Sequence, residues 1–119
     1  MSKAADVSTP SAAQPDVGDD HTPGPPELAP GTHEFLKALA NPSRQRVMLL
    51  FAKGGVLSVG EVAEQAGLGQ STASEHLAAL RRGGIVTSER HGKVVLYRAD
   101  RAGVRTALSD LQAYLLACC

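Results

Sequence analysis

The sequence has no long hydrophobic run: nowhere do about 20 apolar residues follow one another, the length that a membrane-spanning helix needs. The first residues, MSKAADVSTPSAAQPD, also contain no apolar segment of the kind found in a secretory signal. We therefore expect a soluble, cytoplasmic protein without membrane contact. Its 119 residues suffice for one ordinary domain.

Cysteine is scarce, because the chain has only Cys118 and Cys119, which are adjacent at its end. A bridge between neighbouring residues would be strained and would join no distant parts of the chain, so no disulfide framework is expected. Catalytic signatures are missing as well. There is no glycine-rich phosphate loop, no pair of carboxylates in an apolar setting and no nucleophile with a base beside it. The sequence does not predict an enzyme.

A formal net charge of zero hides an uneven distribution of charge. Residues 1–31 contain five acidic residues, one lysine and six of the seven prolines, whereas the remainder has a formal charge of +4. A segment with so few large apolar residues cannot offset the entropy cost of ordering. We predict a disordered acidic, proline-rich tail over 1–31 and a folded domain over 32–119. The domain's basic surplus suits a polyanion partner or an ordinary solvated surface. The tail either competes for that surface or keeps the chain soluble.

Apolar residues at helical spacing, with signals that end helices, divide residues 32–82 into four predicted helices. Thr32 is the expected N-cap of the first, and Ser58 with Glu61 forms a capping box at the start of the third. Gly67 ends the third helix, and only a short glycine-containing turn precedes the fourth. This is the pattern of a helix-turn-helix. The first expected helix runs from Thr32 to the break at Asn41, and the second runs from about Ser43 to Gly54. The third runs from Ser58 to Gly67, and the fourth begins at Gln70 or Ser71 and ends at Gly83.

Two short strands and a last helix complete the predicted fold. Residues 85–87 and 94–97 are typical of strands, and the polar stretch between them predicts a β-hairpin. Apolar residues recur at intervals of four, three and four over about 101–116, which predicts an amphipathic helix whose stripe needs a partner. The expected fold class is mainly α with a β-hairpin wing (α+β), a winged helix-turn-helix. The stripe consists of Val104, Leu108, Leu111 and Leu115.

The second helix of a helix-turn-helix lies in the major groove of DNA and presents its first residues to base edges. Gln pairs with adenine, Glu accepts from cytosine, and Ser and Thr bond to bases or phosphates. With Ala73, Leu77 and Leu80 turned to the core, the remaining face should be polar and exposed. Ser71 is alternatively a simple helix cap and His76 a solvated surface residue. The candidate DNA-binding residues are Gln70, Ser71, Thr72, Ser74, Glu75 and His76.

Basic residues follow at two further places. Arg90, His91 and Lys93 are expected at the hairpin tip, where they reach flanking phosphates or the minor groove, or form a charged turn that keeps an edge strand soluble. Arg82, next to Arg81 at the end of the fourth helix, contacts the DNA backbone or complements the helix dipole.

The run KALANPSRQRVMLLF, followed by LSVGEVAEQAGLGQSTASEHLAALRRGGIVTSERHGKVVLYRAD, resembles the ArsR/SmtB family of bacterial winged-helix repressors. The likeness spans about residues 33–116. Its most specific parts are ALANPSRQRVMLL, QSTASEHLAALRRGGIV and KVVLYR. The resemblance implies four helices, two strands and a fifth helix, a homodimer formed through the first and last helices, and binding to an imperfect inverted repeat near a promoter.

Many members of this family sense metals, but two familiar ligand sets are absent. Where one set has a Leu-Cys-Val-Cys-Asp-like run, residues 57–61 read LSVGE, without thiols. Where the other has Asp-x-His and His-x-x-His or His-x-x-Glu, Asp100 is followed two residues later by Ala102, and the last helix holds no histidine. Neither an arsenic or cadmium site nor the usual zinc, cobalt or nickel site is predicted at these positions.

Other metal-ligating residues remain, namely His21, His33, Cys118 and Cys119. Imidazole with thiolate suits a transition metal ion such as nickel or zinc, and paired thiolates suit arsenite or copper(I). The alternative is that the cysteines are frayed terminal residues and His33 a surface residue. We therefore expect a regulator that answers to a metal or another stress signal, or one that senses nothing itself and acts through a second regulatory protein or thiol oxidation.

Overall fold

The computed structural model describes residues 27–119. Most of the predicted tail lies outside the described residues, and so does His21. Helix α1 spans Pro30–Leu39 and thus begins before the predicted domain boundary. Thr32 was wrongly predicted as its N-cap: Ala29 takes that position, Pro30 is the first helical residue, and Thr32 is buried. Proline favours this position because its fixed φ suits a helix and it leaves no N–H unpaired.

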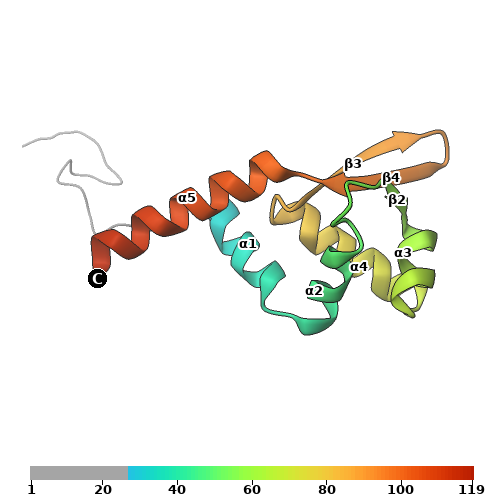
Figure 1. Cartoon of the computed structure of the whole chain (residues 1–119), viewed down its shortest axis with the longest axis horizontal. Helices are drawn as coiled ribbons and strands as arrows, with labels where there is room; N and C mark the ends of the chain where they lie inside the picture. Colours follow the sequence, from blue (N-terminus) through green and yellow to red (C-terminus); the bar gives the residue numbers. More distant parts are fainter. Residues whose placement is uncertain (1–26) are drawn as a thin grey trace, which may run out of the picture.

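The predicted winged helix-turn-helix is confirmed, with the helices and the wing in the expected order (Figure 1). None of the helices in residues 27–119 is long and apolar enough to cross a membrane. After α1 the elements are α2 (Pro42–Leu49), β2 (Leu57–Ser58), α3 (Val59–Ala66), α4 (Gln70–Arg82), β3 (Val86–His91), β4 (Val94–Ala99) and α5 (Arg101–Cys118).

Local side-chain caps set the starts of three helices. The Asn41 side chain accepts a hydrogen bond from the backbone N–H of Arg44 at 3.0 Å, and the Asp100 side chain caps α5 in the same way. Ser58 and Glu61 form the predicted capping box at the start of α3, with bonds of 3.2 and 2.8 Å. Gly67 ends α3 with φ of 68°, a conformation that favours glycine. The helix-turn-helix is therefore encoded locally.

The sheet has one more strand than predicted. Residues of β2 pair with β4, Leu57 opposite Tyr97, so the antiparallel order is β2-β4-β3. Strand β3 is longer than expected and continues through Arg90 to His91. Those two residues lie on the strand, and the turn itself is made by Gly92, at φ of 65°, and Lys93.

Helix α4 occupies the centre of the domain, packed against α1, α3 and β3. Its Leu77 and Leu80 are fully buried. Its C-terminal end approaches α1 closely at Gly83, where an added Cβ would lie 3.0 Å from the carbonyl oxygen of Glu34 and 3.1 Å from Cα of Phe35. Glycine thus allows α1 to hold the end of α4.

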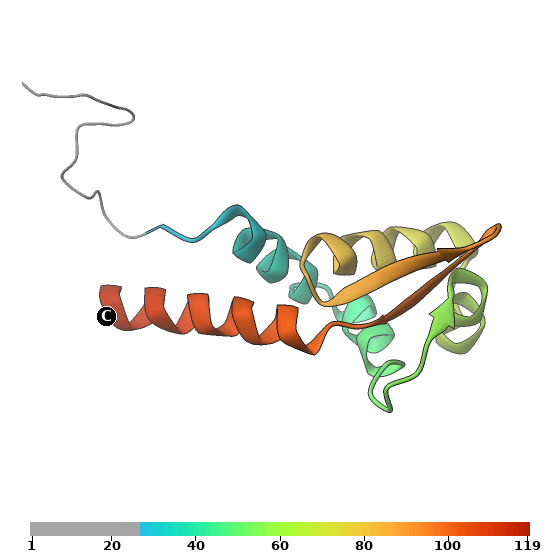
Figure 2. The ribbon, with the colours of Figure 1, turned by 90° about the horizontal axis from the view of Figure 1, so that it is seen from above.

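Helix α5 extends away from the rest of the domain and passes beside α1 (Figures 1 and 2). Ala107 is its one buried residue. Along the predicted stripe Leu108 is 51% and Leu115 49% exposed, and the neighbouring Leu116 is 74% exposed. Within one protomer this apolar surface has no cover among the described residues.

Candidate nucleic-acid interface

The first residues of α4 form an exposed polar surface. Gln70, one of the two predicted starting residues, is the first helical residue, and Gly69 precedes it without a side-chain cap. In the described part of the chain, the backbone N–H groups of this first turn therefore keep their hydrogen-bonding capacity for an anion such as a phosphate. Of the residues predicted here, the exposed ones are Gln70, Ser71, Thr72, Ser74 and Glu75.

His76 does not belong to this surface, which corrects the prediction. Its side chain is buried, with 7% exposure. Nδ1 accepts a hydrogen bond from Arg44 Nε at 3.3 Å, and Nε2 lies 3.2 Å from Ser43 Oγ. His76 follows Ala73 by three positions and precedes Leu80 by four, so it falls on the buried stripe of α4. The spacing of His76 from Ala73 and Leu80 is thus the one sequence feature that indicates its burial.

Burial has an electrostatic consequence for His76. Loss of solvent around the ring lowers the pKa of His76 below its ordinary value, and the neighbouring Arg44 guanidinium lowers it further, while Glu75 acts in the opposite direction. The neutral imidazole is the form that fits between Arg44 and Ser43.

The wing presents its basic residues on an exposed hairpin. Arg90 and His91 are consecutive strand residues, so their side chains point to opposite faces of the wing. Glu89 lies 3.3 Å from His91 Nε2 and 3.9 Å from Arg98 Nη2. Arg90 bonds only to the Gly92 carbonyl oxygen, at 3.4 Å, within the described residues. Arg90 and Lys93 are thus the wing cations without a carboxylate partner in this part of the chain.

A surface hollow of about 400 Å³ connects the wing to the start of α4. Gln70 and Lys93 line it together with the first residues of α3. Pairing of β2 with β4 brings α3 to this place, because Ser58 lies opposite Leu96. Sequence reasoning did not include Ser58, Val59 and Gly60 in the site, since a two-residue strand has too few positions to show alternation.

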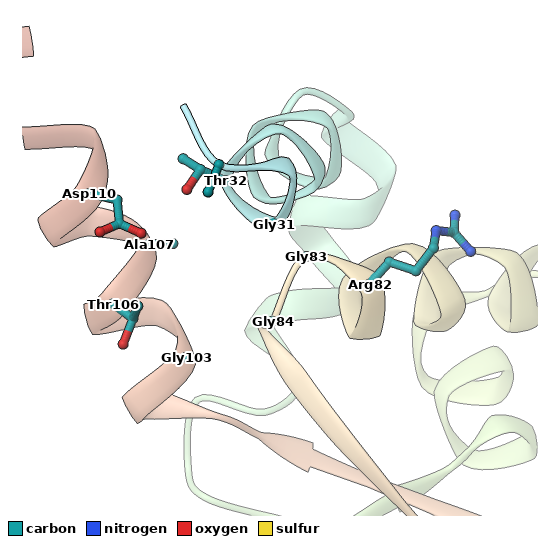
Figure 3. Close-up of a pocket in the computed structure, with 10 residues that line it drawn as sticks. Gly31, Thr32, Arg82, Gly83, Gly84, Gly103, Thr106, Ala107 and Asp110 are labelled. Carbon is teal, nitrogen blue, oxygen red and sulfur yellow. The ribbon is translucent and has the colours of Figure 1, made fainter. Parts of the chain in front are cut away.

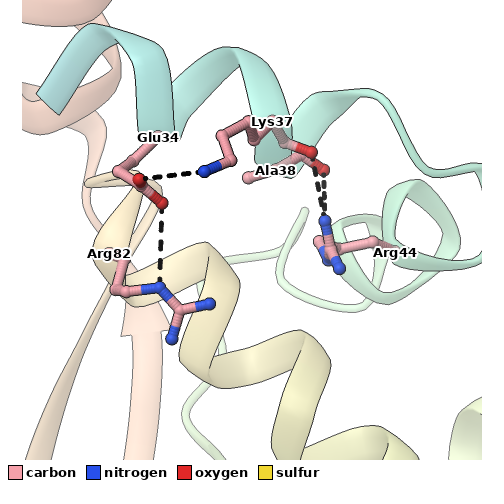
Figure 4. Close-up of polar contacts among 5 residues, drawn as sticks. All are labelled: Glu34, Lys37, Ala38, Arg44 and Arg82. Atoms are coloured by element: carbon pink, nitrogen blue, oxygen red, sulfur yellow. Dashed lines mark hydrogen bonds and ion pairs between the residues drawn. The ribbon is translucent and has the colours of Figure 1, made fainter. Parts of the chain in front are cut away.

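Arg82 lies at the other end of α4, separated from Gln70 by the length of the helix. Its Nε is 3.7 Å from Glu34 Oε1, and Glu34 also pairs with Lys37 at 3.4 Å (Figure 4). The figure also shows Arg44 reaching the carbonyl oxygens at the end of α1. The structure therefore does not place Arg82 together with the other predicted DNA-binding residues.

A second hollow, of about 280 Å³, lies where α1 and α5 meet the turn between α4 and β3 (Figure 3). Glycines line much of it, including Gly83 and Gly84. Thr32 and Asp110 face each other across it, from α1 and α5 respectively. This hollow is far from the start of α4 and belongs to the packing of the two outer helices.

Within the part of the chain that the structure describes, the predicted metal ligands do not assemble into a complete site. His33, Cys118 and Cys119 are exposed, and residues 27–119 contain no group of three or more side chains placed to hold one ion. The two thiols do lie together, with their Sγ atoms 2.8 Å apart. The hydrogen bond between them raises the pKa of Cys118.

Comparison with known proteins is consistent with this geometry. A family model described as a helix-turn-helix domain matches residues 39–89. The chain is 35% identical to the HTH-type transcriptional repressor SmtB of Mycobacterium tuberculosis, and the match covers 76% of this chain and 80% of SmtB. It is 36% identical to the transcriptional activator HlyU of Vibrio cholerae over 77 residues, covering 65% of this chain and 70% of HlyU.

A solved structure from Mycobacterium bovis is also similar. It is a homodimeric winged helix-turn-helix DNA-binding domain, described as a possible ArsR-family transcriptional regulator. The TM-score is 0.57 at 33% sequence identity, and the match covers 70% of this chain and 78% of that one.

Proposed function

The chain belongs to the ArsR/SmtB family of winged helix-turn-helix transcription regulators, and from this premise we propose that it binds an imperfect inverted repeat in duplex DNA as a homodimer. It is a DNA-binding regulator and not an enzyme. In our proposal the start of α4 enters the major groove and the wing contacts the flanking backbone. Because its target is DNA, the protein works in the cytoplasm.

The observation that carries this proposal is the hollow that Gln70 and Lys93 share. It joins an exposed polar helix start to Lys93, a wing cation without a carboxylate partner among residues 27–119, so one surface offers both kinds of contact that sequence-specific DNA binding needs. Gln70 and Ser71 are assigned to base edges, and Arg90 and Lys93 to phosphates. Arg82, which pairs with Glu34, is not assigned a contact with the DNA backbone in this proposal.

Dimerisation through α1 and α5 gives the exposed leucines of α5 a partner. Leu108 and Leu115 are about half exposed in the single chain, an unfavourable position for large apolar side chains on one helix. A two-fold dimer presents two α4 helices related by the same symmetry. Its DNA site should therefore be an inverted repeat.

Fluorescence anisotropy on the DNA upstream of the protein's own gene tests the assignment. We expect Gln70→Ala with Ser71→Ala to lose discrimination between this DNA and a scrambled duplex, by about tenfold or more, because base contacts carry the sequence preference. Gln65→Ala, an exposed amide near the end of α3, is the matched control and should keep the discrimination. If the double variant discriminates as well as the parent, α4 does not read the bases.

We further propose that the regulator answers to a metal ion at the end of α5. Two adjacent, exposed thiols suit a thiophilic ion such as arsenite or copper(I), which thiolates bind preferentially. Zinc or nickel would need an imidazole in addition, from His33 or His21. A bound ion would join the two thiols at the end of α5, a helix that forms the proposed dimer interface. It would thereby change the spacing of the two DNA-binding helices.

Titration of metal-free protein with nickel, zinc, copper(I) or arsenite tests the metal proposal. An effective ion should change the DNA affinity by about tenfold, a coupling of about 1.4 kcal/mol. It should also produce a thiolate-to-metal absorption band, and Cys118→Ser with Cys119→Ser should abolish both signals. The band separates metal binding from any effect on DNA. Equal responses in the parent and the double variant would place the ion elsewhere.

A partner-dependent regulator is the second candidate, in which the winged helix binds another regulatory protein and senses nothing directly. The basic wing and polar α4 surface favour direct DNA binding, which must weaken steeply with salt. Binding to duplex DNA only in the presence of a second protein would favour the alternative.

A further inference from the structure

A partly buried polar cluster ties α4 to α1 and α2, and it has no part in the surface that contacts DNA. We call it the His76 cluster: Ser43, Arg44 and His76, with the carbonyl oxygens of Lys37 and Ala38. Arg44 donates from Nη1 to those carbonyls at 3.2 and 3.4 Å, and from Nε to His76 Nδ1 at 3.3 Å. One guanidinium thus links the end of α1, the start of α2 and the middle of α4.

The geometry selects one form of the imidazole. Arg44 can only donate hydrogen bonds, so His76 Nδ1 must carry a lone pair and not a proton. The single ring proton then sits on Nε2, where it can be donated to Ser43 Oγ at 3.2 Å. Protonation would place an Nδ1–H against the Arg44 Nε–H, which removes this bond and sets two positive charges side by side.

The charges around the cluster do not relieve this conflict. Arg44 is the cation beside the ring, and Glu75 on α4 is the one acidic group that acts on it. On α1, Glu34 is paired with Lys37 and Arg82 instead. The acidic residues of α3 are exposed, and Glu89 of β3 pairs within the wing.

We propose that His76 is a positioning residue for DNA binding: only its neutral form holds α4 at the angle to α1 and α2 that DNA requires, so that protonation releases the DNA. Ser71, Thr72 and Glu75 stand on the same helix within about a turn and a half of His76, so a tilt of α4 at this point displaces them. The inference rests on α4 being the helix that contacts DNA.

The direction of the pH effect distinguishes this role from ordinary charge effects. Protonating an exposed histidine such as His91 adds a cation near DNA and must tighten binding on acidification. Protonating His76 must weaken binding. The DNA affinity of a two-state protein falls in proportion to the fraction of molecules in the DNA-binding state. A dimer binds DNA only when His76 is neutral in both subunits. The DNA affinity should therefore fall, at the limit, with the square of the proton concentration.

The test compares His91→Gln with His91→Gln plus His76→Asn, in the full-length protein. Asparagine offers an amide oxygen near the position of Nδ1 and does not titrate in this range. Between about pH 7.5 and about pH 5.0 we expect His91→Gln to lose about tenfold or more in affinity, and the double variant to lose at least threefold less. Circular dichroism at each pH must show both proteins folded. Parallel pH profiles, or loss of affinity only where the fold is lost, would overturn the proposal.

A second measurement does not depend on the folding of the double variant. In His91→Gln, the titration of the His76 ring followed by NMR should show a lower pKa with specific DNA bound than without it, because DNA selects the neutral form. Phosphates acting merely as charges would raise this pKa, and that result would refute the role. Absence of salt-dependent DNA binding at about pH 7.5 would instead refute the proposed function itself.

Discussion

Removing the two free cations of the wing should flatten the salt dependence of DNA binding. Arg90 and Lys93 have no carboxylate partner among residues 27–119, whereas Glu89 holds His91 and Arg98. A homodimer carries four such free cations. Each phosphate that a cation neutralises contributes about 0.9 to the slope of log affinity against log salt, so Arg90→Ala with Lys93→Ala should lower the slope by about 3.6. Over a fourfold change in salt, the parent should lose about 10²-fold more affinity than this variant.

The assay is fluorescence anisotropy on a specific and a scrambled duplex over a range of potassium chloride concentrations. Both duplexes should show the same change in slope, because phosphate contacts carry no sequence information. Lys53→Ala with Arg98→Ala is the matched control. It removes the same charge at two residues that the proposal does not assign to phosphates, of which Arg98 is paired with Glu89, and it should keep most of the slope. Equal slopes in the two double variants would show that only net charge matters and would refute a phosphate contact by the wing.

Three further changes test the architecture that holds this surface. Gly83→Ala should destabilise the protein by about 1–3 kcal/mol in urea unfolding, since its Cβ would meet the α1 backbone, whereas Gly55→Ala, with open space around it, should be nearly neutral. Leu77→Ala should cost about 2–5 kcal/mol in the same assay, because Leu77 is fully buried and a cavity would remain; a smaller loss would mean that the core collapses around it. Leu115→Asp with Leu116→Asp should give a folded monomer in size-exclusion chromatography with light scattering, and a persistent dimer would exclude the end of α5 from the interface.

Signals within a few residues were sufficient for the helix-turn-helix. The capping box of Ser58 and Glu61, the left-handed Gly67 and the start of α4 at Gln70 all lie where the sequence predicts them. Such features depend on hydrogen bonds between residues three or four apart, which a linear pattern displays directly. The family resemblance drew on the same local runs.

Features that depend on distant residues were missed or misplaced. Strand β2 exists because β4 pairs with it, and neither Leu57 nor Ser58 reveals this alone. Pairing with β4 likewise keeps Arg90 and His91 in β3, although the sequence placed them at the hairpin tip.

The same division applies to the site. The sequence by itself determined which residues begin α4 and that they are polar, because helix starts and composition are local properties. Only the tertiary structure decided that Gln70 and Lys93 line one hollow and that His76 lies inside, bonded to Arg44. A histidine side chain is stable either in solvent or in a buried polar cluster. Whether it is exposed or buried therefore depends on its neighbours in the tertiary structure.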